Sequence, residues 1–217
     1  MNSGTLQINA LQLSRQQQPL LSLSTEIHAG EVLTVMGPSG SGKSSLLNWL
    51  SGLLAPQFSA SGQIVLDGKD ITHLPPHQRH MGLLLQDPLL FPHLNVAENI
   101  AFAMPKAIKG AQRQAQILAA LDSVGLADMA LRNPASLSGG QQARVALLRV
   151  MLAQPKALLL DEPFSKLDSR LRQEVRELVF NFIQQAKIPA LLVTHDQADV
   201  PAAGRLINLA EMEAATC

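Results

Sequence analysis

A glycine-rich segment near residue 40 restricts the fold of this chain more than any other feature. The pattern G-x-x-x-x-G-K-[ST] occupies residues 37–44, directly after an apolar run at 32–36 and before a helix-like stretch at 44–50. This order of strand, loop and helix is typical of phosphate-binding loops, whose backbone N–H groups converge on an anion. The residues that we expect to contact phosphate are Gly37, Pro38, Ser39, Gly40, Ser41, Gly42, Lys43, Ser44 and Ser45.

The residue types in this loop indicate what it binds. Glycine has no Cβ, so the glycines of the loop would let its backbone approach the phosphates closely. Lys43 would reach the β- and γ-phosphates, and the Ser44 hydroxyl would bind Mg²⁺, which prefers oxygen ligands. A glycine-rich turn with an incidental lysine is the alternative, and the flanking strand and helix argue against it. The sequence therefore predicts ATP and Mg²⁺ as ligands.

The rest of the chain predicts an α/β fold around a mostly parallel sheet. Short, nearly continuous apolar runs occur at 32–36, 81–86, 157–160 and 190–194. Such runs are typical of strands that are buried on both faces of a parallel sheet. We expect helices to fill most of the gaps between these strands.

The beginning of the chain has a different pattern. Residues 5–13 and 20–27 alternate apolar and polar side chains, as half-exposed antiparallel strands do, with a glutamine-rich turn at 15–19 between them. Helical spacing of apolar residues follows later, at 110–124 and 170–185, and neither segment contains proline. The sequence predicts an antiparallel β region followed by alternating helices and strands.

Composition narrows the class of protein. The 217 residues include 17 basic and 17 acidic side chains and are 47% hydrophobic. The hydrophobic content suffices for a core, and the charge balance provides no excess to hold nucleic acid. We find no signal peptide and no apolar stretch that approaches membrane-spanning length. Cys217, the single cysteine, excludes a disulfide within the chain and favours a reducing compartment.

Two acidic residues follow the apolar run at 157–160. Asp161 would stand at the carboxyl end of a strand, where open α/β sheets place Mg²⁺ ligands. Glu162, one step further along, would face the γ-phosphate and act as general base toward the attacking water. The alternative is that both carboxylates only cap the next helix. We assign Asp161 to the metal and Glu162 to catalysis.

A second glycine motif, Leu-Ser-Gly-Gly-Gln, occupies residues 137–141. Ser138 is a good N-cap, Gly139 and Gly140 clear space for an anion, and the helix dipole would point toward it. Together with residues 142–149 this motif closely resembles the signature of ATP-binding-cassette (ABC) proteins. In that family the anion is the γ-phosphate bound by a second subunit, so the resemblance implies a head-to-tail dimer in which Ser138, Gly139, Gly140 and Gln141 contact ATP.

The resemblance also implies a fold and domain organisation. It predicts one ABC ATPase domain over residues 1–217, with a phosphate-loop NTPase core, an N-terminal antiparallel β subdomain and an inserted helical signature subdomain at about 88–153. Only a short strand-like segment, 205–209, follows the histidine region. We therefore expect no C-terminal regulatory domain.

Three further residues match family positions. Gln86 corresponds to the glutamine that contacts Mg²⁺ and water and relays movement to a membrane partner. Asp168 corresponds to the aspartate of a loop that crosses the dimer interface, and Lys166 departs from the small residue often found in that loop. His195 corresponds to the histidine that bonds the γ-phosphate and holds Glu162 and the water in place.

Two segments, 74–79 and 86–100, resemble the importer branch that serves periplasmic binding proteins. The resemblance implies a peripheral subunit at the cytoplasmic face of the inner membrane. Its partners would be a second copy of itself, integral membrane permease subunits and, indirectly, a solute-binding protein, with no nucleic acid. The apolar residues of the loop after Gln86 would either accept a short permease helix or be buried in the helical subdomain. These residues are Leu89, Leu90, Phe91 and Leu94.

Other classes of protein fit less well. A soluble ABC-type ATPase that acts on DNA or ribosomes typically has a coiled-coil insertion, zinc sites or two cassettes, none of which is visible. A GTPase would need N-K-x-D or T-K-x-D, which is absent. One family feature is also missing, because no aromatic residue precedes Trp49 to stack on adenine. We expect Arg15 to lie on the base instead, or Leu13 and Leu20 to supply apolar contact.

Overall fold

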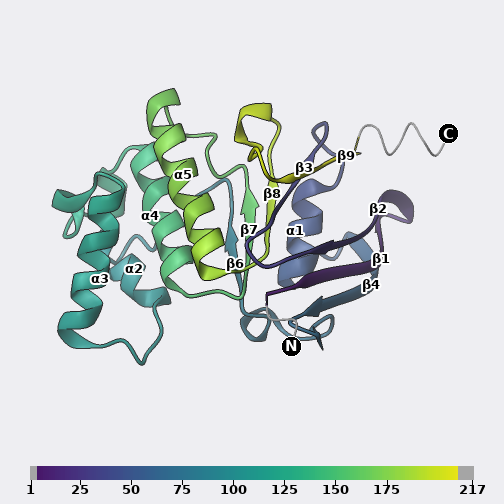
Figure 1. Cartoon of the computed structure of the whole chain (residues 1–217), viewed down its shortest axis with the longest axis horizontal. Helices are drawn as coiled ribbons and strands as arrows, with labels where there is room; N and C mark the ends of the chain where they lie inside the picture. The colour runs from purple at the N-terminus through teal and green to yellow at the C-terminus, as the bar shows by residue number, and fades with distance from the viewer. Residues whose placement is uncertain (1–3, 210–217) are drawn as a thin grey trace. The chain divides into compact units, whose positions relative to one another are not determined.

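The computed structural model describes residues 4–209, which form two compact units (Figure 1). The first unit comprises Met1–Leu83, Lys156–Glu162 and Phe180–Cys217. The second comprises Leu84–Pro155 and Pro163–Val179, and therefore includes the helical subdomain expected at 88–153. Cys217, on which the expectation of a reducing compartment depended, lies outside the described residues.

An antiparallel sheet forms one part of the first unit. Its strands, in the order β2-β1-β4-β5, are Gln18–Ile27, Leu6–Arg15, Phe58–Leu66 and Lys69–Asp70. The turn between β1 and β2 is shorter than the expected 15–19, because only Gln16 and Gln17 separate the strands. Their φ values of 50° and 68° are both positive, as a two-residue type I′ hairpin turn requires.

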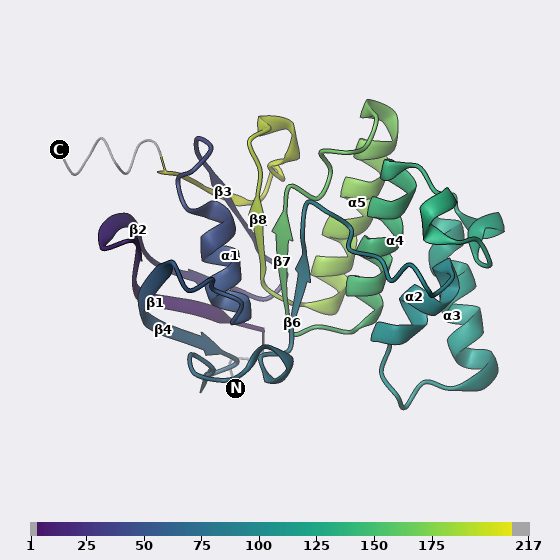
Figure 2. The same ribbon diagram turned by 180° about the vertical axis from the view of Figure 1, so that it is seen from behind.

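A parallel sheet forms the other part of the first unit (Figure 2). Its strands, in the order β6-β7-β8-β3-β9, are Met81–Leu84, Ala157–Asp161, Ala190–Val193, Val32–Met36 and Arg205–Asn208. The described residues of β7 and β8 are buried throughout, which explains why their sequences are continuous apolar runs. The predicted α/β fold with a mostly parallel sheet is confirmed. Parallel pairing also gathers the carboxyl ends of β3, β7 and β8 at one edge.

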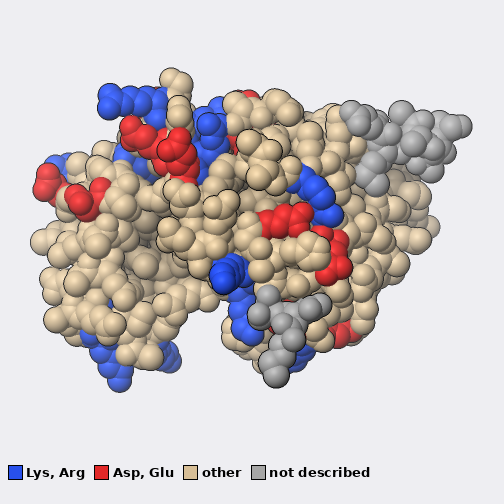
Figure 3. Space-filling model, in the orientation of Figure 1, with Lys and Arg blue, Asp and Glu red and all other residues tan. Residues whose placement is uncertain are grey.

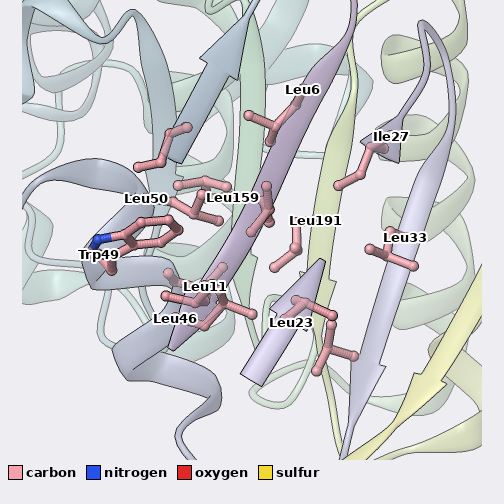
Figure 4. Packing of buried hydrophobic residues seen from close by; sticks show 14 of the residues in the cluster. Leu6, Leu11, Leu23, Ile27, Leu33, Leu46, Trp49, Leu50, Leu159 and Leu191 are labelled. Atoms are coloured by element: carbon pink, nitrogen blue, oxygen red, sulfur yellow. The ribbon is translucent and has the colours of Figure 1, made fainter. Parts of the chain in front are cut away.

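The hydrophobic core of the first unit joins both sheets to helix α1, Lys43–Ser51 (Figure 4). Leu46 and Leu50 of this helix have no exposed surface and pack with side chains of β1, β2, β3, β7 and β8. The buried Arg79 closes the other end of α1 by donating hydrogen bonds to the carbonyls of Trp49 and Leu50, each at 2.8 Å. Helix α1 ends at Gly52, whose left-handed backbone caps it and whose N–H also donates to the Trp49 carbonyl, and the arginine supplies further donors to this end.

Helices build the second unit, as both ribbon views show. They are α2, α3, α4 and the first part of α5, with bounds Val96–Ala103, Gly110–Ser123, Gly139–Leu152 and Ser169–Ala186. The predictions at 110–124 and 170–185 correspond to α3 and α5. Eight-residue α2 was not predicted; its start is fixed by a capping box between Asn95 and Glu98. Short 3₁₀ helices occur at Pro76–Gln78, Ala127–Met129, Pro134–Ser136 and Gln197–Asp199.

On the face that Figure 3 shows, acidic and basic side chains lie in small groups among mostly uncharged residues, and some groups of opposite sign are neighbours. This mixture agrees with the equal numbers of acidic and basic residues in the sequence. Among the helices of residues 4–209, none has the length and apolar character needed to cross a bilayer.

Candidate functional site

The phosphate-binding loop lies between β3 and α1 in the first unit. Gly40 and Gly42 have φ values of +86° and +90°, which L side chains rarely adopt, and among the described residues no atom lies within 4 Å of a Cβ built at Gly40. The Lys43 ammonium donates hydrogen bonds to the carbonyls of Gly37, at 2.8 Å, and Pro38, at 2.7 Å. The lysine thus already lies over the loop. Since Gly42 supplies no side-chain cap, the first N–H groups of α1 suit an anion.

Asp161 lies at the end of β7 beside this loop, with 8% of its surface exposed. Burial raises the pKa of the Asp161 carboxyl, and the nearby Glu162 carboxylate raises it further. A hydrogen bond from Ser44 and the positive charge of Lys43 act in the opposite direction on the same pKa. These influences show that the four predicted residues share one site.

The donor set at this site suits Mg²⁺. Within residues 4–209, no group of three His, Cys, Asp or Glu side chains is placed to hold a metal. Mg²⁺ does not need such a group, because it commonly takes one or two protein oxygens together with phosphate oxygens and waters. Ser44 and Asp161 supply two hydrogen-bonded oxygens next to the loop. These two residues fit the ion.

Glu162 and His195 form a direct pair at the carboxyl edge of the parallel sheet. His195 Nδ1 lies 2.9 Å from Glu162 Oε1. A carboxylate can only accept hydrogen bonds, so Nδ1 carries the hydrogen when Glu162 is ionised. Glu162 has a φ of 47°, an uncommon value for a residue with a side chain, and its N–H donates to the Val193 carbonyl at 2.9 Å. Such strain is often found at functional residues.

A small network behind His195 was not predicted from the sequence. The Thr194 hydroxyl donates to the buried Asp199 carboxylate at 2.9 Å and accepts from the Asp196 N–H at 3.1 Å. Asp196 in turn accepts from the Ala198 N–H at 2.9 Å. This network fixes the turn that carries His195. Its sequence signal is the set of hydroxyl and carboxyl residues directly after an apolar strand, which is typical of side-chain-bonded turns.

The end of the first hairpin also reaches the phosphate-binding loop. A Cβ built at Gly42 would lie 3.1 Å from the Leu20 side chain and 3.5 Å from that of Leu13. Arg15 lies two residues after Leu13 on β1. Its guanidinium lies 5.9 Å from the ring centroid of Phe58, which is its partner in the β1–β4 register. The sequence did not point to Phe58, because β4 was not predicted. Alternation of apolar side chains within residues 58–66 was the available signal.

The second unit contains the other predicted residues. Ser138 caps α4 through a capping box: its Oγ accepts from the Gln141 N–H at 3.3 Å, and the Gln141 side chain accepts from the Ser138 N–H at 2.8 Å. Within residues 4–209, no atom lies within 4 Å of a Cβ built at Gly139, whereas one built at Gly140 would lie 3.2 Å from the Lys166 carbonyl oxygen. Gly139 leaves open space, and Gly140 permits a close backbone contact.

Gln86 and Asp168 are both in loops of the second unit. Gln86 is exposed and follows β6, which ends at Leu84 rather than at residue 86 as predicted. Asp168 precedes α5, and its carboxylate accepts from the Leu171 N–H at 3.1 Å. The expected site residues therefore divide into a group around the phosphate-binding loop in the first unit and a group that includes the signature motif in the second.

Comparison with known proteins identifies the family. Residues 20–165 match the family described as ABC transporter. The chain belongs to this family. It is 47% identical over 192 residues to an uncharacterized ABC transporter ATP-binding protein of Escherichia coli (strain K12), covering 88% of each chain. The resemblance inferred from the signature motif is confirmed.

Further ABC relatives carry import names. The chain is 42% identical to the Fe(3+) ions import ATP-binding protein FbpC of Agrobacterium fabrum, covering 89% of this chain and 54% of that protein. It is also 42% identical to the sulfate/thiosulfate import ATP-binding protein CysA of Nephroselmis olivacea, covering 82% and 51%. The chain thus spans about half the length of these two relatives.

A solved structure supports the assignment of activity. A dimeric ATP-binding cassette in a post-hydrolysis state, bound to ADP and Pi, superposes with a TM-score of 0.80 at 28% identity and covers 94% of this chain and 93% of that one. This ABC chain is an ATP-binding, ATP-hydrolysing subunit.

Proposed function

We propose that this ABC ATPase drives the import of a solute through a separate permease. The observation that carries the proposal is the Glu162–His195 pair, held at 2.9 Å beside Asp161 and the phosphate-binding loop. The import names of the iron and sulfate/thiosulfate relatives support the direction of transport. These relatives lend no support to the alternative of a soluble ABC-type ATPase acting on DNA or ribosomes.

The residues of the first unit would perform hydrolysis in a defined order. Lys43 would exchange the Gly37 and Pro38 carbonyls for the phosphates of ATP. Glu162 would accept a proton from water as the water oxygen bonds to the γ-phosphorus and the bond to the ADP oxygen breaks. His195, fixed to Glu162 through Nδ1, would hold the base in position and present its other ring nitrogen to the γ-phosphate.

Mg²⁺ would be held by Ser44, Asp161 and Gln86, of which the first two already share a hydrogen bond. When bound, the ion would neutralise charge on the phosphate oxygens as the reaction proceeds. The mixture of hydroxyl, carboxylate and amide oxygens suits its preference for oxygen ligands. Asp161 would reach it through the water shell.

The catalytic form would be a head-to-tail dimer. Ser138 and Gly139 are exposed at the positive end of α4, where no protein atom fills the space beside Gly139. We propose that this end, with Gly140, Gln141 and the Asp168 loop, contacts the γ-phosphate region of a second copy. The dimeric solved relative supports this assembly.

The base of ATP would stack on Arg15. The guanidinium already lies over Phe58, which would support one face while the other meets the base. Leu13 and Leu20, which pack close to Gly42, would contribute apolar contact between the base and the loop. The two expected modes of adenine binding are thus combined.

The permease would dock on the loop after Gln86. Its apolar residues divide between the two expected roles, because Leu90 packs against the core of the second unit, whereas Leu89 is 63% exposed. The Phe91 ring packs against the Phe102 ring at a tilt of 59°, with centroids 4.7 Å apart, and Phe102 is 69% exposed. We propose that Leu89, Phe91 and Phe102 receive the permease, which would place the chain at the cytoplasmic face of the membrane, with a solute-binding protein on the other side.

Reconstitution tests this function. The chain is copurified with its native permease, placed in liposomes, and supplied with the associated binding protein and that protein's ligand. We expect ligand uptake only when Mg-ATP is present on the side of the chain. ATP hydrolysis that never depends on the permease, or ligand movement in the opposite direction, would reject the proposal.

A further inference from the structure

We propose that Lys166 is a positioning residue that ties three segments of the second unit into one assembly. The three are the start of α4 at Gly140, the loop that begins with Gln86, and the loop that ends with Asp168. The tie is the ion pair between Lys166 and Asp87, which we call the clasp. The inference rests on the proposed function, because that function assigns roles to all three segments.

Lys166 contacts two of these segments from its own loop. Its Nζ lies 2.7 Å from Oδ1 of Asp87, the residue that follows Gln86. Its carbonyl oxygen would lie 3.2 Å from a Cβ built at Gly140, and the Leu167 side chain would lie 3.5 Å from it. Side chain and backbone of one residue therefore connect the Gln86 loop to the signature helix.

Helix α4 holds the same loop at a second place. The Arg149 guanidinium donates hydrogen bonds of 3.0 Å to the carbonyls of Leu89 and Pro88. It also lies 5.5 Å from the ring centroid of Phe91, and burial lowers its pKa from the usual value without removing its charge at neutral pH. The loop from Asp87 to Phe91 is thus attached to α4 through Arg149 and to the start of α4 through Lys166.

These contacts form a ring that begins and ends in α4. It runs from Gly140 to Lys166, across the clasp to Asp87, along the chain to Leu89, and through Arg149 back into α4. When the loop moves, it would pull on α4 at two places, the start of the helix near Lys166 and the Arg149 side chain. We therefore expect the whole helix to move with the loop instead of rotating about Arg149. The clasp is the polar link whose charge can be reversed without touching the phosphate-binding loop.

Two observations make this ion pair more effective than an ordinary surface pair, which contributes little. The Lys166 side chain is only 35% exposed, and its backbone carbonyl approaches Gly140 closely. Asp87 is 80% exposed but precedes Pro88, whose carbonyl is held by Arg149. Less conformational entropy is therefore lost when the pair forms. A small residue at position 166 could not reach Asp87, so the ring of contacts would lack this link.

Charge reversal tests the clasp without nucleotide. Amide hydrogen exchange is measured over residues 86–91 in Lys166→Glu, Asp87→Lys and the double variant. We expect each single variant to speed exchange about threefold, and the double variant to restore it to within about 1.5-fold of wild type. Lys106→Glu, which changes the same charge on an exposed residue of the second unit, is the control and should leave exchange unchanged.

A second readout addresses positioning. If the clasp holds Gln86, each single variant should raise the Mg²⁺ concentration for half-maximal Pi release about threefold, with a smaller change in KM for ATP, and the double variant should recover. Unchanged exchange in the single variants, or a double variant impaired by the product of the two single effects, would overturn the clasp. Normal Mg²⁺ dependence in Gln86→Ala would instead reject the proposed role of Gln86, and the exchange result would still decide the clasp.

Discussion

The two groups of site residues differ in what holds them. In the first unit each proposed catalytic side chain has a partner: Lys43 bonds two carbonyls, Ser44 bonds Asp161, and His195 bonds Glu162. In the second unit the signature lies at an exposed helix end whose capping bonds leave space beside Gly139. We therefore expect the residues at the sheet edge to carry out the chemistry and the exposed helix end to contact a second molecule.

The variant with the largest expected effect tests the proposed catalytic group of the first unit. Glu162→Gln should keep Mg-ATP binding but lower kcat at least about 10²-fold, because an amide cannot accept the proton from water. Binding and Pi release are measured on the same preparation, and Glu177→Gln on the exposed surface of α5 serves as the control. Near-normal hydrolysis would remove Glu162 from the mechanism.

Lys43→Ala separates binding from chemistry. This variant should lose affinity for ATP itself, since the lysine contributes charge to the bound phosphates, whereas Glu162→Gln should not. Equal affinity losses in both variants would show that the two residues do not have distinct roles.

Subunit mixing tests the surface of the second unit. A carboxylate introduced by Gly140→Asp would repel the γ-phosphate of a partner chain. With a threefold excess of variant, about one sixteenth of random dimers are wild type on both sides, whereas dilution alone leaves about one quarter. If a dimer turns over only when both of its sites are intact, Pi release should fall to the lower fraction once subunit exchange is demonstrated.

Activity proportional to the wild-type share would show that each site turns over independently, either in a monomer or as the intact site of a mixed dimer. Gly140→Ala is the matched variant, because its methyl group meets the same Lys166 carbonyl without adding charge. A similar loss in that variant would attribute the effect to crowding within the chain.

Base recognition should be weaker than phosphate recognition. Arg15→Ala should weaken ATP and GTP alike by up to about tenfold, and wild type should use GTP within about tenfold of ATP. Phe58→Leu should have a smaller effect in the same direction if the ring only supports the guanidinium. Lys69→Ala, on the same sheet, controls for lost charge. A hundredfold ATP preference that survives Arg15→Ala would contradict stacking on this residue.

The smallest expected effect concerns stability without nucleotide. The pKa of Asp161 is raised by burial, so the folded chain binds this proton more tightly than the unfolded chain. Wild-type stability should therefore fall as pH rises from the ordinary pKa through the raised one. Asp161→Asn should remove this dependence and raise the melting temperature at pH 8 by about 2–4 °C. A lower melting temperature at pH 8 would contradict the burial penalty.

Local patterns allowed the first unit to be predicted more fully than the second. The strands at 32–36, 157–160 and 190–194 were found because each is buried on both faces, and the phosphate-binding loop because its glycines recur at fixed spacing. The roles assigned to the site residues stay predictions. Their grouping at one sheet edge follows from parallel pairing, which sequence order implies.

The missed features depend on partners far away in the sequence. Strand β4 and its Phe58 gain their role from Arg15, and Asp87 gains its role from Lys166. Helix α2 is short, and the buried Asn99 fixes the loop before it through bonds to Phe91 and Leu94. A propensity-based reading sees none of these contacts, since each residue alone is compatible with an ordinary surface loop.

The backbone conformation of Glu162 is a cost to the stability of the fold at a residue that we propose is needed for ATP hydrolysis. Its φ of 47° is unfavourable for glutamate, and glycine would adopt the same angle without strain. Relief of this strain favours glycine at position 162, whereas the hydrogen bond to His195, the greater backbone freedom of glycine in the unfolded chain and the proposed task of the carboxylate favour glutamate. The melting temperature of Glu162→Gly, compared with that of wild type, would show whether the strained backbone of this residue costs more stability than its side chain contributes.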